Sequence, residues 1–205
     1  NIPSAQIAIA VDGRLKLLWS LTLGELGWPM TQPMSKFRVA SCSKFLTAMR
    51  AVSVGIMPSG KHFLDTSIPD ALGLSADEIV GAPVVGNRFQ NATVKDFLRM
   101  VGGINQPDFT LQSWRHGGRS LPMTLGLFRE SIKNGWDSSA GFMKYEPRTY
   151  EEYDNVAFSV VGEALGQQLL GNSSTPYLDV MFDETFWPGN LESHINVIQP
   201  TRQEC

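Results

Sequence analysis

The fold is decided by residues 37–49, which read FRVASCSKFLTAM. Ser41 and Lys44 lie three residues apart where the sequence predicts the start of a helix. Because positions i and i+3 share one face of a helix, the Lys44 amine can reach the Ser41 hydroxyl. A serine is a poor nucleophile until a neighbouring group takes its proton, and an amine is one group that can do so. Roughly one Ser-x-x-Lys pair is expected by chance in a chain of this length, so the surrounding sequence carries the argument.

Predicted elements on both sides give this stretch its context. Residues 5–11 (AQIAIAV) and 14–27 (RLKLLWSLTLGELG) are strand-like and flank Asp12-Gly13, a pair typical of a two-residue hairpin turn. Over residues 41–55 the apolar spacing predicts a buried helix. The residues that set this helical period are Phe45, Leu46, Met49 and Val52.

Further helices are predicted later in the chain. Thr93 is a good N-cap and Asp96 stands at the capping-box position, so a helix is predicted over residues 93–100. A buried helix is predicted from Asn155 to about Leu170. A hairpin alone cannot bury a sheet face, so the predicted sheet is short of strands. Weaker patterns predict helices at 75–80, 121–134 and 176–185 and a last strand at 195–198.

Composition restricts the classes of function. The 205 residues are 42% hydrophobic and 10% aromatic, which suits a packed domain, and the net charge of −3 comes with no cluster of basic residues. We therefore expect no nucleic-acid partner, and no apolar run is long enough to predict a membrane span. His62, His116 and His194 have no metal-ligand spacing, so neither a metal nor a cofactor is expected. Cys42 and Cys205 predict no disulfide framework.

The order of these segments resembles the serine β-lactamase and penicillin-binding protein superfamily, especially its class C-like branch of DD-peptidases, family VIII esterases and related acyltransferases. Residues 37–49 resemble its nucleophile helix, with Ser41 and Lys44 at the motif positions. Residues 92–104 (ATVKDFLRMVGGI) resemble a stretch that members usually spell with His-Thr-Ser-Gly. Tyr153-Asp154-Asn155 matches the second motif, Tyr-x-Asn, and the predicted apolar helix follows it.

The resemblance covers the chain to about residue 189 and implies an α+β fold of the β-lactamase/transpeptidase type. In that fold an antiparallel sheet is flanked by helices and joined to a mostly helical lobe. We therefore expect a single domain over residues 1–205, with sheet strands in residues 1–27 and the helical lobe in residues 41–190.

The resemblance also implies roles for particular side chains. Ser41 would attack an ester or amide carbonyl and carry the acyl group, close to the backbone N–H groups at the start of its helix. Lys44 and Tyr153 would form a coupled pair, in which an ammonium stabilises a phenolate and the phenolate stabilises the ammonium. The sequence does not assign which of them takes the serine proton. Asn155 would hydrogen-bond the Lys44 amine or the acyl side chain of the substrate.

A third motif of the superfamily, Lys/His-x-Gly on a strand late in the fold, has no match here. No lysine follows Lys144, and the last histidine begins His194-Ile195-Asn196. We therefore expect a domain that is incomplete at its C-terminal end and lacks the last strands of the sheet. Three explanations stay open: a fragment whose remainder is cleaved away or is a second chain that completes the sheet, the ordered part of a longer protein, or a short natural form that completes its sheet as a homo-oligomer or no longer catalyses. The first two are favoured, because an uncovered hairpin edge is prone to aggregation.

The leading hypothesis is a serine hydrolase or acyltransferase that works through an acyl-enzyme on Ser41, with an esterase or acyltransferase on small acyl substrates favoured. A DD-peptidase or a β-lactamase is the alternative within the superfamily, and a small ester, amide or β-lactam is the expected partner. A non-catalytic scaffold or binding protein is the alternative from another class. A working site needs the Lys44 nitrogen and the Tyr153 oxygen within about 3–4 Å of the Ser41 oxygen. The compartment stays open between the cytoplasm and, after signal removal, the periplasm or the exterior.

Overall fold

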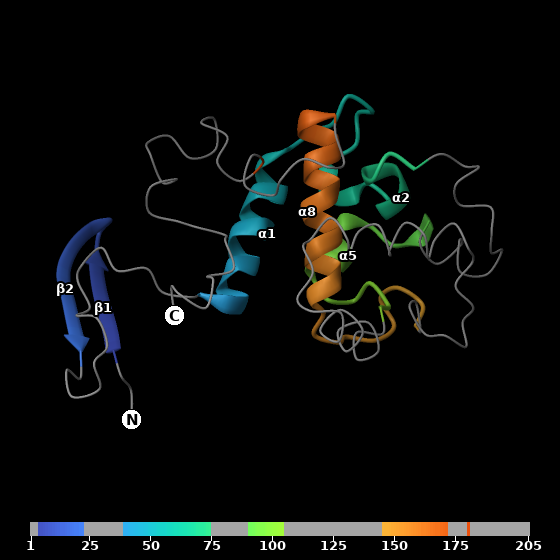
Figure 1. The fold of residues 1–205 in the computed structure, drawn as a ribbon. Helices are drawn as coiled ribbons and strands as arrows, with labels where there is room; N and C mark the ends of the chain where they lie inside the picture. The colour runs from blue at the N-terminus through green and yellow to red at the C-terminus, as the bar shows by residue number, and fades with distance from the viewer. Residues whose placement is uncertain (1–3, 23–38, 75–89, 105–144, 172–179, 181–205) are drawn as a thin grey trace, which may run out of the picture. The chain divides into compact units, whose positions relative to one another are not determined.

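The computed structural model describes residues 4–22, 39–74, 90–104, 145–171 and 180. Its β-hairpin belongs to one compact unit and its helices belong to a second, Ala40–Gly189, which we call the helical unit (Figure 1). A small antiparallel sheet together with helices agrees with the predicted α+β class. The helices predicted at 75–80, 121–134 and 176–185 and the strand at 195–198 lie outside the described residues, apart from Val180.

The hairpin forms where the sequence predicts it. Strand β1 (Ser4–Val11) pairs antiparallel with β2 (Arg14–Thr22), and Val11 lies opposite Arg14. The two turn residues between them, Asp12 and Gly13, have φ values of 51° and 70°. Left-handed values at both positions define the turn that matches the twist of paired strands, and Asp-Gly is among the pairs that adopt it most readily. The register shifts between Ile9 and Ala10, which marks a β-bulge in the hairpin.

Helix α8 (Asn155–Leu170) is the central element of the helical unit. It contacts α1 (Ser43–Ser53), α2 (Ile68–Ala71) and α5 (Val94–Leu98), and Figure 1 shows it between α1 on one side and α2 and α5 on the other. A helix that meets neighbours on several sides needs apolar residues around much of its circumference. Its buried apolar residues are Val156, Ala157, Val160, Val161, Ala164 and Leu165.

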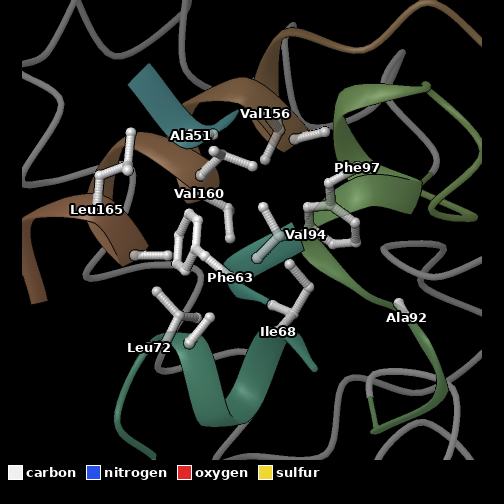
Figure 2. Close-up of a cluster of buried hydrophobic side chains, with 14 of the residues drawn as sticks. Ala51, Phe63, Ile68, Leu72, Ala92, Val94, Phe97, Val156, Val160 and Leu165 are labelled. Atoms are coloured by element: carbon white, nitrogen blue, oxygen red, sulfur yellow. The ribbon is translucent and has the colours of Figure 1, made fainter. Parts of the chain in front are cut away.

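The hydrophobic core lies where these helices meet (Figure 2). Phe63, from the short 3₁₀-helix η3 (Phe63–Asp65), and Phe97 of α5 are both fully buried. Burying one such side chain stabilises the folded state by about 1.5–3 kcal/mol relative to leaving it exposed. The core residues labelled in Figure 2 are Ala51, Phe63, Ile68, Leu72, Ala92, Val94, Phe97, Val156, Val160 and Leu165.

Helix α1 buries a different face from the one that the apolar spacing predicts. Phe45 is 66% exposed and Val52 is 57% exposed. Residues 47, 50, 51 and 54 also share one helical face, so periodicity alone does not say which face meets α8. Arg50 can be buried because its Nε donates to the Val180 carbonyl at 3.0 Å. The buried residues of α1 are Thr47, Arg50 and Ala51.

Helix α5 has the capping box that the sequence predicts. The Thr93 N–H donates to Asp96 Oδ2 at 2.9 Å, and the Asp96 N–H donates to Thr93 Oγ1 at 3.3 Å. The helix is shorter than predicted, because Met100 has a φ of 60°, which ends helical geometry. Among the residues that the structure describes, none of the helices combines the length and the apolarity needed to cross a membrane.

Candidate active site

The structure brings Ser41, Lys44, Tyr153 and Asn155 together. Ser41 lies in the 3₁₀ turn η2 (Ala40–Cys42) directly before α1, and Lys44 is the second residue of α1. Lys44 Nζ lies 3.4 Å from Ser41 Oγ, and the Tyr153 hydroxyl hydrogen-bonds the same oxygen. Lys44 Nζ also donates to the Tyr153 oxygen at 2.7 Å and to Asn155 Oδ1 at 2.5 Å. Residues more than 100 positions apart thus form one hydrogen-bonded cluster.

The N-terminus of α8 explains why Tyr153 and Asn155 reach the same place. Between them Asp154 is extended, with φ −136° and ψ 120°. In an extended backbone residues i and i+2 point to the same side and the residue between them points to the other. The Asp154 side chain accordingly turns inward, where it is 3% exposed. Its Oδ1 accepts hydrogen bonds from Val156 N at 2.7 Å and Ala157 N at 3.2 Å, which caps the helix.

Lys44 sets the electrostatics of the cluster. The hydrogen bond from Lys44, with a smaller contribution from Ser41, holds the pKa of the Tyr153 phenol below its usual value, although partial burial opposes the change. Lys44 Nζ also lies 4.6 Å from the centroid of the Tyr153 ring and 5.6 Å from that of Phe158. The Tyr153 side chain remains 46% exposed, so water weakens these interactions. Lys44 therefore makes the phenolate form of Tyr153 easier to reach, next to the Ser41 hydroxyl, than it is in a free tyrosine.

Asp154 is the middle residue of the Tyr-x-Asn match, and the sequence alone assigns it no role. The structure shows it to be the cap of α8, and the signal for this was an Asp directly before an apolar helix. Burial raises the pKa of Asp154 to about 6, against the lowering effect of the two backbone hydrogen bonds. The neighbouring Glu152 also raises this pKa and Lys44 lowers it.

The arrangement is suited to nucleophilic chemistry at Ser41. The Ser41 hydroxyl is hydrogen-bonded to the Tyr153 phenol, whose pKa is lowered, and the Lys44 ammonium lies beside both groups. Two tyrosines that precede Tyr153 in the sequence, Tyr145 and Tyr150, lie against each other, with ring centroids 4.4 Å apart. Within the described part of the chain, no three His, Cys, Asp or Glu side chains gather as they would to hold a metal ion.

Comparison with known protein families identifies the family of this chain. The Beta-lactamase family model matches residues 1–204, so the chain belongs to the Beta-lactamase family. This confirms the predicted superfamily of serine β-lactamases and penicillin-binding proteins. Membership supports a serine hydrolase-like function in general, on small ester, amide or β-lactam substrates. Comparisons with curated proteins and with solved structures found no match.

Proposed function

We propose that this chain is a serine hydrolase or acyltransferase that forms an acyl-enzyme on Ser41, with esters of small acyl groups as its favoured substrates. The observation that carries the proposal is the position of the Tyr153 hydroxyl, which is hydrogen-bonded to both Ser41 Oγ and Lys44 Nζ. A scaffold without chemistry has no physical need for these contacts among three polar side chains. The geometry therefore favours the catalytic reading over the scaffold reading.

In the acylation step Tyr153 is the general base. Its phenolate takes the Ser41 proton while Oγ forms a bond to the carbonyl carbon of the substrate. Negative charge moves to the carbonyl oxygen, and the backbone N–H groups at the start of α1 favour that charge. When the intermediate collapses, the bond to the leaving group breaks and Tyr153 returns the proton to it.

Deacylation repeats these transfers with water or an acceptor alcohol or amine. Tyr153 takes the proton of the incoming nucleophile, and Ser41 Oγ recovers a proton as the acyl bond breaks. Lys44 lowers the pKa of Tyr153 and so favours the phenolate that acts as the base, and the Asn155 amide orients the Lys44 ammonium through its Oδ1. Contact between Asn155 and the substrate is a further part of the proposal.

The motif residues support one branch of the superfamily and one type of substrate. A tyrosine in the second motif supports the class C-like branch of the superfamily. Residues 100–103 read Met-Val-Gly-Gly where members usually have His-Thr-Ser-Gly. Esterase-type members tolerate more change around these motifs, which supports an ester substrate over a β-lactam. A penicillin-binding DD-peptidase or β-lactamase is the second candidate, and a separate probe distinguishes it.

Labelling with two covalent probes tests the proposal. A fluorophosphonate reports any activated serine, and a fluorescent penicillin reports the second candidate. We expect fluorophosphonate labelling of the wild type and none in Ser41→Ala. In Tyr153→Phe and Lys44→Ala the labelling rate should fall by at least about 10²-fold.

Two matched variants serve as controls. Tyr150→Phe removes a hydroxyl from a neighbouring exposed tyrosine, and Cys42→Ala removes the exposed thiol beside Ser41. Both should label like the wild type. The proposal fails if neither probe labels the wild type, or if labelling survives in Ser41→Ala.

A further inference from the structure

Arg148 and Asp96 form an ion pair next to the segment that carries Tyr153. Arg148 Nε donates to Asp96 Oδ1 at 3.0 Å, and Nη2 donates to Oδ2 at 2.8 Å. Nη2 also donates to the main-chain carbonyl of Asn91 at 3.1 Å. Two parallel N–H···O bonds fix the relative orientation of a guanidinium and a carboxylate as well as their distance. The pair therefore holds Arg148 in one place.

The Asp96 carboxylate is itself held in place by hydrogen bonds and by burial. Its carboxylate is part of the capping box of α5 and also accepts from Thr93 Oγ1 at 2.8 Å. Burial alone raises the pKa of Asp96, but the bonds from Arg148 and Thr93 outweigh it and keep this pKa below its usual value. The residue is 4% exposed, and its neighbours Val94 and Phe97 are fully buried in the core. An ionised carboxylate is thus fixed to the core of the helical unit.

The backbone at Arg148 has an unusual conformation. Its φ is 71°, in the left-handed region that residues other than glycine rarely adopt. The Arg148 side chain is 59% exposed, so core packing does not hold it there. The Asp96 pair and the bond from Arg148 N to the Val101 carbonyl at 2.8 Å do hold it.

The chain between Arg148 and Tyr153 is fixed at both ends. Main-chain hydrogen bonds keep residues 145–152 along residues 100–103. They run from Tyr145 N to Gly103 O at 3.1 Å, from Arg148 N to Val101 O at 2.8 Å, and from Glu152 N to Met100 O at 3.0 Å. Tyr153 follows directly, and the buried cap at Asp154 fixes the other side.

We infer that Arg148 is a positioning residue, which through its ion pair with Asp96 fixes the backbone that places the Tyr153 hydroxyl against Ser41 and Lys44. The inference rests on the proposed function, because Tyr153 is the base in that proposal. Arg148 itself touches no reacting atom. Misplacement of a catalytic group by about 1 Å can cost about 10²-fold in rate. An ion pair at Arg148, five residues before Tyr153, can therefore matter for catalysis.

Arg148→Gly is the most informative variant. It removes the ion pair, and it also relieves the left-handed backbone, since glycine adopts positive φ freely. The two changes therefore have opposite effects on the free energy of unfolding, whereas the displacement of the Tyr153 hydroxyl remains. We expect fluorophosphonate labelling of Ser41 to slow by about 10- to 100-fold. We also expect the Tyr153 pKa to rise towards its usual value, because the phenol moves away from Lys44.

The Tyr153 pKa is measured by absorbance at alkaline pH as the difference from a Tyr153→Phe background. Arg148→Lys keeps the charge but loses the paired bonds, and it should give a smaller change in both readouts. Arg99→Gln removes an exposed positive charge from the same unit and should change neither. Urea unfolding of each variant shows whether it is folded under the assay conditions.

The outcomes separate this inference from the proposed function. Unchanged labelling and an unchanged Tyr153 pKa in folded Arg148→Gly and Arg148→Lys would overturn the inference alone. An unlabelled wild type would overturn the proposed function, while the Tyr153 pKa would still report whether Arg148 places the phenol. If Arg148→Gly does not fold, the two readouts in Arg148→Lys decide in the same way.

Discussion

Replacing Asp154 by asparagine is expected to stabilise the helical unit at neutral pH. The Asp154 carboxylate is 3% exposed and accepts two backbone N–H groups of α8. An asparagine Oδ1 accepts the same bonds, so Asp154→Asn keeps the helix cap. Burial raises the pKa of Asp154 to about 6, so ionisation of this group at pH 7 opposes folding. The variant removes that cost.

The magnitude follows from the two pKa values. The pKa rises from 3.8 to about 6, and each pH unit corresponds to about 1.4 kcal/mol, so the full effect is about 3 kcal/mol. Below pH 4 the group is protonated in both states and contributes nothing. Between pH 4 and 6 the unfolded chain releases its proton first, so the free energy of unfolding falls as the pH rises. The full cost is present above about pH 6.

Urea unfolding at several pH values from 4 to 7.5, followed by the circular dichroism of the helices, measures this effect. The stability of Asp154→Asn relative to the wild type should increase by up to about 3 kcal/mol across this range. Asp70→Asn, which removes an exposed carboxyl of the same unit, controls for the loss of a negative charge. A stability difference that stays constant with pH would refute the reasoning, as would a wild type that gains stability over the variant towards pH 7.5.

Three further predictions concern the site and the core. Lys44→Ala should raise the Tyr153 pKa towards its usual value in an absorbance titration, and an unchanged pKa would remove Lys44 as the cause. Gly103→Ala should lower the free energy of unfolding by about 1–3 kcal/mol, because φ is 87° and the new Cβ would collide with the carbonyl of residue 145. Gly171→Ala, with φ 64° and open space around the Cβ, should cost less, and equal losses would contradict the collision. Phe63→Ala should cost about 3–5 kcal/mol in urea unfolding, and a loss below 1 kcal/mol would contradict its place in the core.

Local signals in the sequence were enough to predict several elements. Asp12-Gly13 between apolar runs predicted the hairpin turn, and Thr93 with Asp96 predicted the capping box, because in each case the deciding contacts lie within a few residues. The long apolar run predicted α8 for the same reason. The buried face of α1 could not be predicted this way, since two stripes on that helix have the helical period and only the neighbours decide between them.

The candidate site shows the same difference between contacts within a few residues, which the sequence predicts, and contacts between distant segments. Spacing alone brings Lys44 within reach of Ser41, whereas Tyr153 and Asn155 were identified through the resemblance to a family. Asp96 and Arg148 are 52 positions apart and no pattern in the sequence pairs them, so only the folded chain shows their contact. Contacts that depend on the packing of distant segments were beyond what patterns in this sequence could predict.

The proposed reaction requires that Ser41 carry an acyl group during turnover. The most direct measurement is to mix the protein with an activated acetyl ester, quench with acid before turnover is complete, and map the modified peptide by mass spectrometry. A mass increase of one acetyl group is expected on Ser41, and it should disappear in Ser41→Ala and persist in Cys42→Ala. Ester hydrolysis without an adduct on Ser41, or an adduct found on Cys42 instead, would contradict the proposed reaction.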